Sequence, residues 1–112
     1  PLEILSVFDF ADPNLVVGTR TTSSVPTQAL YLMNSPFVRE QADLAAKHLL
    51  SEKLPDESAR IQRAYQRVLG RNATSKEREI LLKFLNAQTD TAKAWAQIIH
   101  GLYASLDFRY LN

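Results

Sequence analysis

The chain has 112 residues, of which 46% are hydrophobic and 22% are charged, and both values are ordinary for a globular protein. Thirteen basic and twelve acidic residues give a formal net charge of +1, so the chain has no bulk electrostatic field that would hold nucleic acid or an anionic membrane. The lack of cysteine excludes a disulfide, a thiolate zinc site, a cysteine nucleophile and a covalently attached c-type haem within this chain.

Residues 1–24 are predicted to form a short helix followed by an irregular polar segment. The apolar side chains of residues 2–8 fall on one side of a helix, but no helical period continues after them. The run Asp12-Pro13-Asn14 is typical of a turn, because a residue before proline avoids the helical region and Asn and Asp bond their own backbone. A stretch of this length without regular structure is either functional or packs against other elements. Its apolar residues lead us to expect that it packs across the helices.

Residues 25–112 are predicted to form a helical body, because apolar residues recur there at helical spacing between capping and breaking signals. The expected helices are one from Thr27 to Met33, one from Pro36 to about Lys53, and three that follow Asp56, Thr74 and Asp90. The expected N-caps are Ser24, Ser35, Asp56, Thr74 and Asp90. Thr74 and Glu77 together fit a capping box, and Gly70 stands where a left-handed residue is expected to end a helix.

Each long helix has an apolar stripe that is predicted to face the core. The stripes are Val38, Ala42, Ala45 and Leu49; then Ile61, Ala64, Tyr65 and Val68; then Leu81, Phe84, Leu85 and Gln88; and finally Trp95, Ile98, Ile99, Leu102 and Leu106. Gly101 in the last helix costs roughly 1 kcal/mol relative to alanine, so we expect it to allow close approach of another backbone. Residues 107–110 are expected to close the chain with a final turn.

The predicted fold is all-α, an array of four or five short helices with the irregular N-terminal segment packed across them. Tight connections favour antiparallel or angled neighbours over a long coiled coil. We interpret residues 1–112 as a single helical domain. Because the sequence starts on Pro1 without a basic and apolar leader, we expect it to be a fragment of a larger domain. No apolar run approaches the ~20 residues of a membrane span.

No metal site is expected, since the sequence contains no convergent set of ligands. His48 and His100 lie far apart, neither has a second histidine three or four residues away, and each is interpreted as a surface or partly buried imidazole. Asp9, Asp12 and Asn14 are oxygen ligands within a short window. They lack the alternation and the distal glutamate of a calcium loop, so we interpret them as turn-forming residues.

The chain carries no recognisable catalytic motif. Neither G-x-S-x-G nor S-x-x-K occurs, and no pair of carboxylates is indicated. Gly18-Thr19-Arg20 lacks the further glycines of a phosphate-binding loop. We therefore favour a role without catalysis in this chain.

The run Arg20-Thr21-Thr22-Ser23-Ser24 is the strongest candidate for a binding site. Free amides at the start of a helix beside a guanidinium would suit a carboxylate, sulfate or phosphate. The alternative, which we prefer, is that the hydroxyls cap the helix while Arg20 pairs with an aspartate, either Asp9 or Asp12, and fixes the irregular segment to the fold.

The third expected helix carries a row of arginines, which are Arg60, Arg63, Arg67 and, past its end, Arg71. Such a row could meet an acidic partner. Gln62 and Gln66 interrupt it and Glu57 offsets its charge, so we predict a solvated helix face. Asn72-Ala73-Thr74 matches a glycosylation sequon, but the hydroxyl of Thr74 is better explained as a helix cap.

Four blocks of the sequence resemble a known family. They read FDFADPN, TTSSVPTQALYLMNSPFV, AYQRVLGRNATSKE and LYASLDFRYLN. Their order and spacing are similar to the planctomycete-type domain of unknown function number 1553, whose patterns are FDF-DP, TT-x-PTQAL-x-LMN-x-PFV, AY-x-x-LGR-x-P-T-x-x-E and S-x-EF-x-YLN. Asn72-Ala73 stands where the family often has proline and Asp107 where it often has glutamate, and both changes preserve the capping pattern.

The resemblance implies a setting rather than an activity. The family domain is longer, so the chain resembles its C-terminal portion. Members of the family look like large exported proteins, periplasmic or at the cell surface, that carry a cytochrome-c-like domain and a second uncharacterised domain upstream. Any haem would then belong to an upstream domain, and this chain itself is expected to hold no cofactor.

Our leading hypothesis is a non-catalytic docking or scaffold domain that contacts upstream domains of the same polypeptide. The polar residues expected to organise its surface are Asp9, Arg20, Gln28 and Asn34, and the wider candidate binding set adds Asp12, Thr21 and Thr22. One alternative is that these residues form part of an active site that upstream domains complete. Another is a module that binds a small anion or carbohydrate around Arg20.

Overall fold

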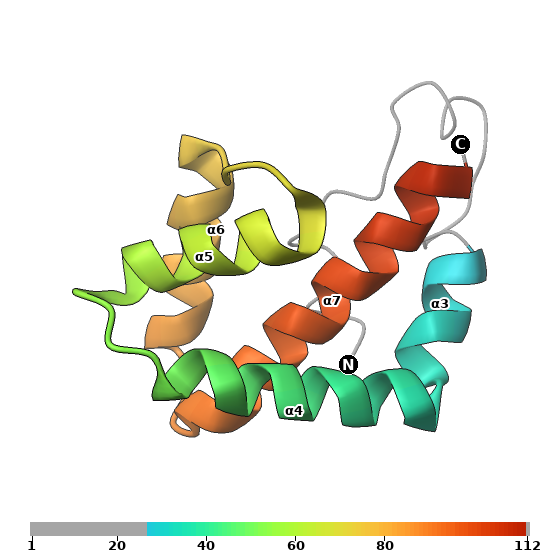
Figure 1. Ribbon diagram of the computed structural model, residues 1–112, viewed down its shortest axis with the longest axis horizontal. Coiled ribbons are helices and arrows are strands. Elements are labelled where there is room, and N and C mark those ends of the chain that lie inside the picture. The colour runs from blue at the N-terminus through green and yellow to red at the C-terminus, as the bar shows by residue number, and fades with distance from the viewer. Residues whose placement is uncertain (1–26, 112) are drawn as a thin grey trace.

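The computed structural model describes the backbone of residues 27–111 and the side chains of residues 30–106. In this part of the chain the structure consists of helices, without strands, so the predicted all-α fold is confirmed (Figure 1). The helices are α3 (Thr27–Asn34), α4 (Pro36–Ser51), α5 (Glu57–Leu69), α6 (Ser75–Asn86) and α7 (Thr91–Leu111). The predictions for residues 1–24 lie outside the described residues, and the single-domain organisation stays a prediction.

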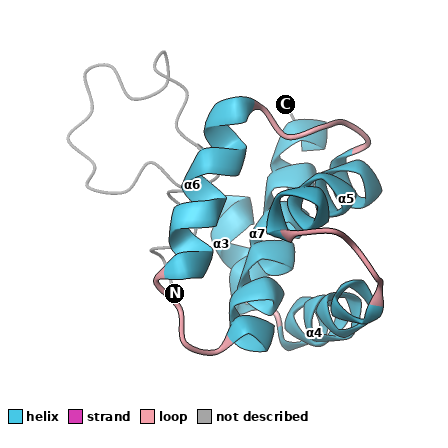
Figure 2. Ribbon diagram, turned by 90° about the vertical axis from the view of Figure 1, so that its left-hand side faces the viewer, coloured by secondary structure: helices cyan, strands magenta, loops and turns pink. Residues whose placement is uncertain are grey.

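Helix α7 is the centre of the arrangement. It contacts α3, α4, α5 and α6, most extensively α4. Figure 1 shows it running diagonally between α3 on one side and α5 and α6 on the other, and Figure 2 shows α6 and α4 on opposite sides of it. The helix continues through Leu111, so residues 107–110, for which a final turn was predicted, belong to α7. Within the described residues, no helix is long and apolar enough to cross a membrane.

The buried core follows the predicted stripes closely. The fully buried large side chains are Trp95, Tyr65, Ile61, Leu81, Ile98 and Leu102, and all six belong to predicted stripes. Ala46 is also buried although it was not predicted, because the inner face of α4 is centred between Ala42 and Leu49. Gln88 is the clear error, since α6 ends at Asn86 and Gln88 is exposed beyond it.

The helix starts confirm the predicted caps within the described residues. In three of these caps a backbone amide donates to the side-chain oxygen of the cap residue: Val38 N to Ser35 Oγ at 3.3 Å, Ala59 N to Asp56 Oδ1 at 2.8 Å, and Lys93 N to Asp90 Oδ1 at 3.0 Å. At α6 the capping box is complete: Glu77 N donates to Thr74 Oγ1 at 3.1 Å, and Thr74 N donates to Glu77 Oε1 at 2.8 Å. Each cap satisfies a backbone amide that the helix itself leaves without a partner.

Side chains join α5 to the helices on either side. The indole N–H of Trp95 in α7 donates to Glu57 Oε2 at 3.1 Å, and Arg60 Nε donates to Glu57 Oε1 at 2.9 Å. Gln62 in α5 holds the loop that leads to α6, because its Oε1 accepts from Ala73 N at 2.8 Å and its Nε2 donates to Ala73 O at 3.4 Å. Arg71 lies over the ring of Tyr65, with its guanidinium carbon 5.4 Å from the ring centroid.

Gly70 ends α5 in the predicted left-handed conformation, with φ 70° and ψ 21°. Its amide donates to the carbonyls of Tyr65 and Gln66, both at 3.1 Å. A Cβ added at Gly70 would meet no atom within 4 Å, so the demand for glycine there is conformational rather than steric.

We predict that Gly70→Ala lowers the free energy of unfolding by about 1 kcal/mol, because an L side chain is strained at this positive φ. Gly70→Asn should cost less, since asparagine tolerates the left-handed region. Urea denaturation of the three proteins measures both effects. An alanine variant as stable as wild type would contradict the conformational explanation.

Candidate functional site

Most of the predicted binding residues lie outside the described part of the chain. This applies to Asp9, Asp12, Arg20 and the threonines at 21 and 22, so neither the anion site nor the predicted pairing of Arg20 is tested. Two predicted residues lie in α3. The backbone of Gln28 is helical but its side chain lies outside the described set, and Asn34 is the exposed last residue of the helix.

Asn34 lies in a polar groove at the junction of α3, α4 and α7. The groove consists of two adjoining pockets of about 410 and 240 Å³, which share Arg39 and Asp43. The first is lined by Asn34, Pro36, Arg39, Glu40 and Asp43, and the second by Met33, Arg39, Asp43, Lys93, Ala96, Gln97 and His100. The two acidic and two basic side chains balance, so this polar groove suits a neutral or mixed-charge partner better than a strong anion.

His100 closes the inner wall of the polar groove. It is buried in α7, and its Nε2 donates to the Leu32 carbonyl oxygen at 3.1 Å. Because a carbonyl can only accept, the ring must carry a proton on Nε2. The same carbonyl accepts from Ser35 N at 3.2 Å, so His100 helps to satisfy the C-terminal end of α3. Burial lowers the pKa of His100, while the Leu32 hydrogen bond acts in the opposite direction.

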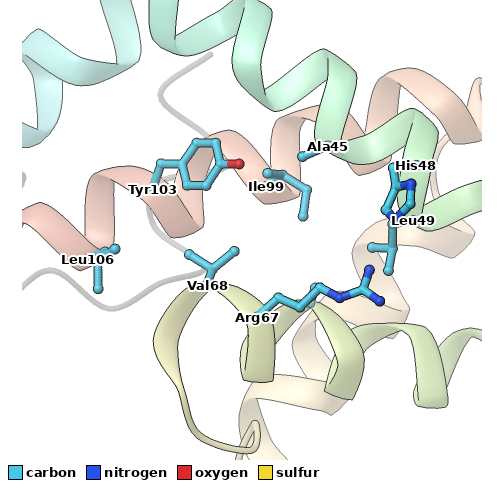
Figure 3. A pocket seen from close by; sticks show the side chains of 9 residues that line it. Ala45, His48, Leu49, Arg67, Val68, Ile99, Tyr103 and Leu106 are labelled. Atoms are coloured by element: carbon cyan, nitrogen blue, oxygen red, sulfur yellow. The ribbon is translucent and has the colours of Figure 1, made fainter.

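A second hollow, the apolar pocket, lies between α4, α5 and α7 and has a volume of about 250 Å³. It is lined by Ala45, His48, Leu49, Ala64, Arg67, Val68, Ile99, Tyr103 and Leu106 (Figure 3). Its polar groups are the imidazole of His48, the guanidinium of Arg67 and the hydroxyl of Tyr103. Burial raises the pKa of Tyr103, so its hydroxyl stays protonated at neutral pH.

The arginine row is only partly the predicted solvated face: Arg63 and Arg67 are 39% and 44% exposed, but every arginine of the row is ion-paired within the domain. Arg60 pairs with Glu57, Arg63 and Arg67 both pair with Glu52, and Arg71 pairs with Glu77. The physical reason is the position of α4, whose C-terminal end meets α5 and bears the partial negative charge of its last carbonyls. Arg60 Nη1 donates to one of them, Leu49 O, at 2.7 Å. The arginines therefore fasten α5 to its neighbours.

Glu52 is the most heavily contacted carboxylate in this row. Arg63 Nη1 donates to its Oε1 at 2.6 Å, Arg67 Nη1 donates to its Oε2, and His48 Nε2 lies 3.7 Å from Oε2. The hydrogen bond from Arg67 and the charges of the arginines hold the pKa of Glu52 below its ordinary value, although desolvation acts against them. Sequence reasoning missed Glu52 because its partners lie on the next helix. A carboxylate at the C-terminal end of a helix, followed by a helix with an arginine row, was the available signal.

His48 is exposed, as predicted, whereas His100 is buried more deeply than the predicted surface or partly buried position. In the part of the chain that the structure describes, no three side chains of the His, Cys, Asp and Glu types are grouped as metal ligands. The turn-forming interpretation of Asp9, Asp12 and Asn14 stays a prediction, because these residues lie outside that part.

Comparison with known protein families shows the family to which the chain belongs. The model of the family described as "Protein of unknown function (DUF1553)" matches residues 1–85. The chain belongs to the DUF1553 family. No curated protein and no solved structure matches it. The matched range ends within α6, so it includes the polar groove residues of α3 and α4 but not those of α7.

The stability of the domain should fall between pH 7 and pH 5 because of His100. The unfolded imidazole titrates near 6.5 and the folded one at a lower pH, so in this window the unfolded chain binds more protons. The free energy of unfolding should therefore fall as the pH drops below 6.5 and level off below the folded pKa. We expect His100→Gln, which keeps an N–H donor, to show a smaller fall in urea denaturation across this window. The matched control is His48→Gln, and an equal fall in both variants would contradict the assignment to His100.

Glu52→Gln should lower the melting temperature, because it removes the shared carboxylate of Arg63 and Arg67 and leaves two neighbouring guanidinium groups. The difference from wild type should shrink at about 1 M salt, where like-charge repulsion is screened. Below pH 4.5 the wild-type advantage should also disappear as the pH falls through the lowered pKa of Glu52. Glu79→Gln, at an exposed carboxylate of α6, serves as the control in thermal melts. A salt-independent difference would show that the ion pairs are not its cause.

Proposed function

We propose that this chain is a non-catalytic docking domain that packs against upstream domains of the same polypeptide. Its contact surface, which we call the α3–α4 face, consists of Tyr31, Asn34, Phe37 and Leu44 together with the α3–α4 side of the polar groove. The observation that carries the proposal is the exposure of three large apolar side chains there: Tyr31 is 73% exposed, Phe37 67% and Leu44 55%. Among the described residues, these are the large hydrophobic side chains that are exposed to solvent.

Two of these three side chains lie on one helix face. Phe37 and Leu44 are two turns apart on α4 and therefore share one face, which is opposite the buried Ala42 and Ala46. Aromatic residues are enriched in the buried centres of protein interfaces, where a polar rim surrounds them. On the α3–α4 face, Asn34 and the charged side chains of the polar groove provide that rim.

The family resemblance supports the same surface. Asn34 and Phe37 belong to the block PTQALYLMNSPFV, and the family pattern has the same residues at both positions. Both side chains are exposed, so packing within the described helices does not explain their place in the pattern. Exposed positions that belong to a family motif are better explained by contact with a partner.

The perturbed ionisable groups support a structural rather than a catalytic role. The groups with shifted pKa values are Glu52, Arg71, Glu77, His100 and Tyr103. For the first three the leading cause is an intramolecular hydrogen bond between an arginine and a carboxylate, and for the last two it is burial. None of these shifts requires a reacting group to explain it.

The cellular setting is part of the same proposal. By family resemblance we place the chain at the C-terminal end of an exported multidomain protein, periplasmic or on the cell surface. Any haem would be held by a cytochrome-c-like domain upstream. The support is the order of the four sequence blocks. In the runner-up function, the same surface would complete an active site or bind a carbohydrate.

The docking function is tested by producing the parent polypeptide as two pieces, this chain and the portion before Pro1, and measuring their association by titration calorimetry. Phe37→Asp and Leu44→Asp should each weaken association at least about tenfold, because each places a charge in the apolar contact. Ala92→Asp, at an exposed position of α7, is the matched control and should leave association unchanged. Pieces that fail to associate, or a Phe37→Asp variant that binds like wild type, would contradict the proposal.

A further inference from the structure

The apolar pocket has two chemically different ends. Figure 3 shows the Arg67 guanidinium and the His48 imidazole at one end, Val68 and Leu106 toward the other, and Ile99 between them. These two side chains make the first end polar. Both also approach the same oxygen, Glu52 Oε2, with His48 Nε2 3.7 Å from it. The rest of the lining is aliphatic apart from Tyr103. A ligand that fits this pocket has an apolar body and one polar end.

The charge at the polar end of the pocket indicates which charge the polar group of the ligand carries. Two guanidinium groups, Arg63 and Arg67, face the single carboxylate of Glu52, so the cluster carries one excess positive charge before His48 is counted. Arg67 has five N–H donors, of which Nη1 is used by Glu52. Its other N–H groups have no hydrogen-bond partner among the described residues. An arginine with free donors beside an apolar cavity favours a carboxylate, which accepts two parallel hydrogen bonds.

The size of the pocket limits the apolar body. A volume of about 250 Å³ is many times what one water molecule needs, so the pocket has room for a short alkyl chain. The Tyr103 hydroxyl, which Figure 3 shows directed toward Ile99, adds a donor on the side wall. An alkyl chain of this length would fill the space between Ile99 and Leu106.

We propose that the apolar pocket binds a medium-chain carboxylate, with the alkyl chain against Val68, Ile99 and Leu106 and the carboxylate at Arg67 and His48. This site is separate from the α3–α4 face, and the proposal does not rest on the docking function. The ligand carboxylate would add a second anion to a cluster that Glu52 alone does not neutralise. The hydrophobic effect would supply the affinity for the chain, and Arg67 the preference for an acid.

The test is a titration of the ¹⁵N-labelled full chain with sodium octanoate, followed by amide chemical shifts. Shifts should centre on α4, α5 and α7 around the apolar pocket. Octan-1-ol, which has the same chain without the charge, should bind at least about tenfold more weakly, since a hydrogen-bonded charge is worth more than a neutral contact. Octylammonium should not compete with octanoate. Equal affinity for the acid and the alcohol would overturn the proposal, as would the absence of shifts at about 10 mM octanoate.

Two pairs of variants separate the polar end from the apolar body. Arg67→Gln should weaken octanoate about tenfold and leave octan-1-ol unchanged, whereas Arg78→Gln on α6 makes the same charge change away from the pocket and should alter neither. Ala45→Phe fills the pocket and should abolish binding of both, with Ala92→Phe as the exposed control.

The variants also remain informative if Arg67→Gln unfolds the domain through its contact with Glu52. Arg67→Lys then keeps the charge but loses the planar fork, and it should bind octanoate more weakly than wild type. Octanoate binding that survives Ala45→Phe, or that Arg67→Lys and Arg67→Gln both leave unchanged, would place the ligand elsewhere and overturn the proposal.

Discussion

The hydrogen bond between Trp95 and Glu57 is the contact on which the arrangement of the helices depends. The indole ring is fully buried in α7, so its N–H must find a partner inside the protein. Glu57 Oε2 provides that partner at 3.1 Å, from the first turn of α5. The other oxygen of the carboxylate accepts from Arg60 at 2.9 Å, which balances the charge beside the core. One side chain of α5 thus satisfies the largest buried residue of α7 and orients the first arginine of its own helix.

The position of α5 set by this contact explains why its arginines are paired. Once Glu57 is held against α7, Arg60 faces the last carbonyls of α4 and bonds Leu49 O at 2.7 Å. Arg63 and Arg67 lie one and two turns further along, where Glu52 follows the end of α4. A negative helix end that is followed by a carboxylate therefore meets a row of cations at matching spacing. Because Arg63 and Arg67 share the single carboxylate of Glu52, one positive charge is left unbalanced, and Arg67 lies at the rim of the apolar pocket.

The helix caps that were predicted correctly from the sequence are local interactions, and the ion pairs and hydrogen bonds between helices that were missed are not. Each cap joins groups three residues apart, and Gly70 bonds carbonyls four and five residues before it, so a short window of sequence contains the whole interaction. The side-chain contacts between helices join residues 15, 38 and 68 positions apart: Arg67 with Glu52, Trp95 with Glu57, and His100 with Leu32. Their chemistry is visible in the sequence, but their proximity is created by helix packing.

The same distinction explains why near-neutral composition was a poor guide to local charge. A formal net charge of +1 excludes a field over the whole molecule, yet it says nothing about where the charges collect. In the polar groove two acids and two bases balance, while around Glu52 two arginines share one carboxylate beside an aliphatic cavity. Electrostatic attraction weakens with distance, so an unbalanced charge at the rim of the apolar pocket acts more strongly on a group bound there than the net charge of the chain does. The recognition proposed for this domain therefore lies at helix junctions, where unbalanced charge meets an apolar lining.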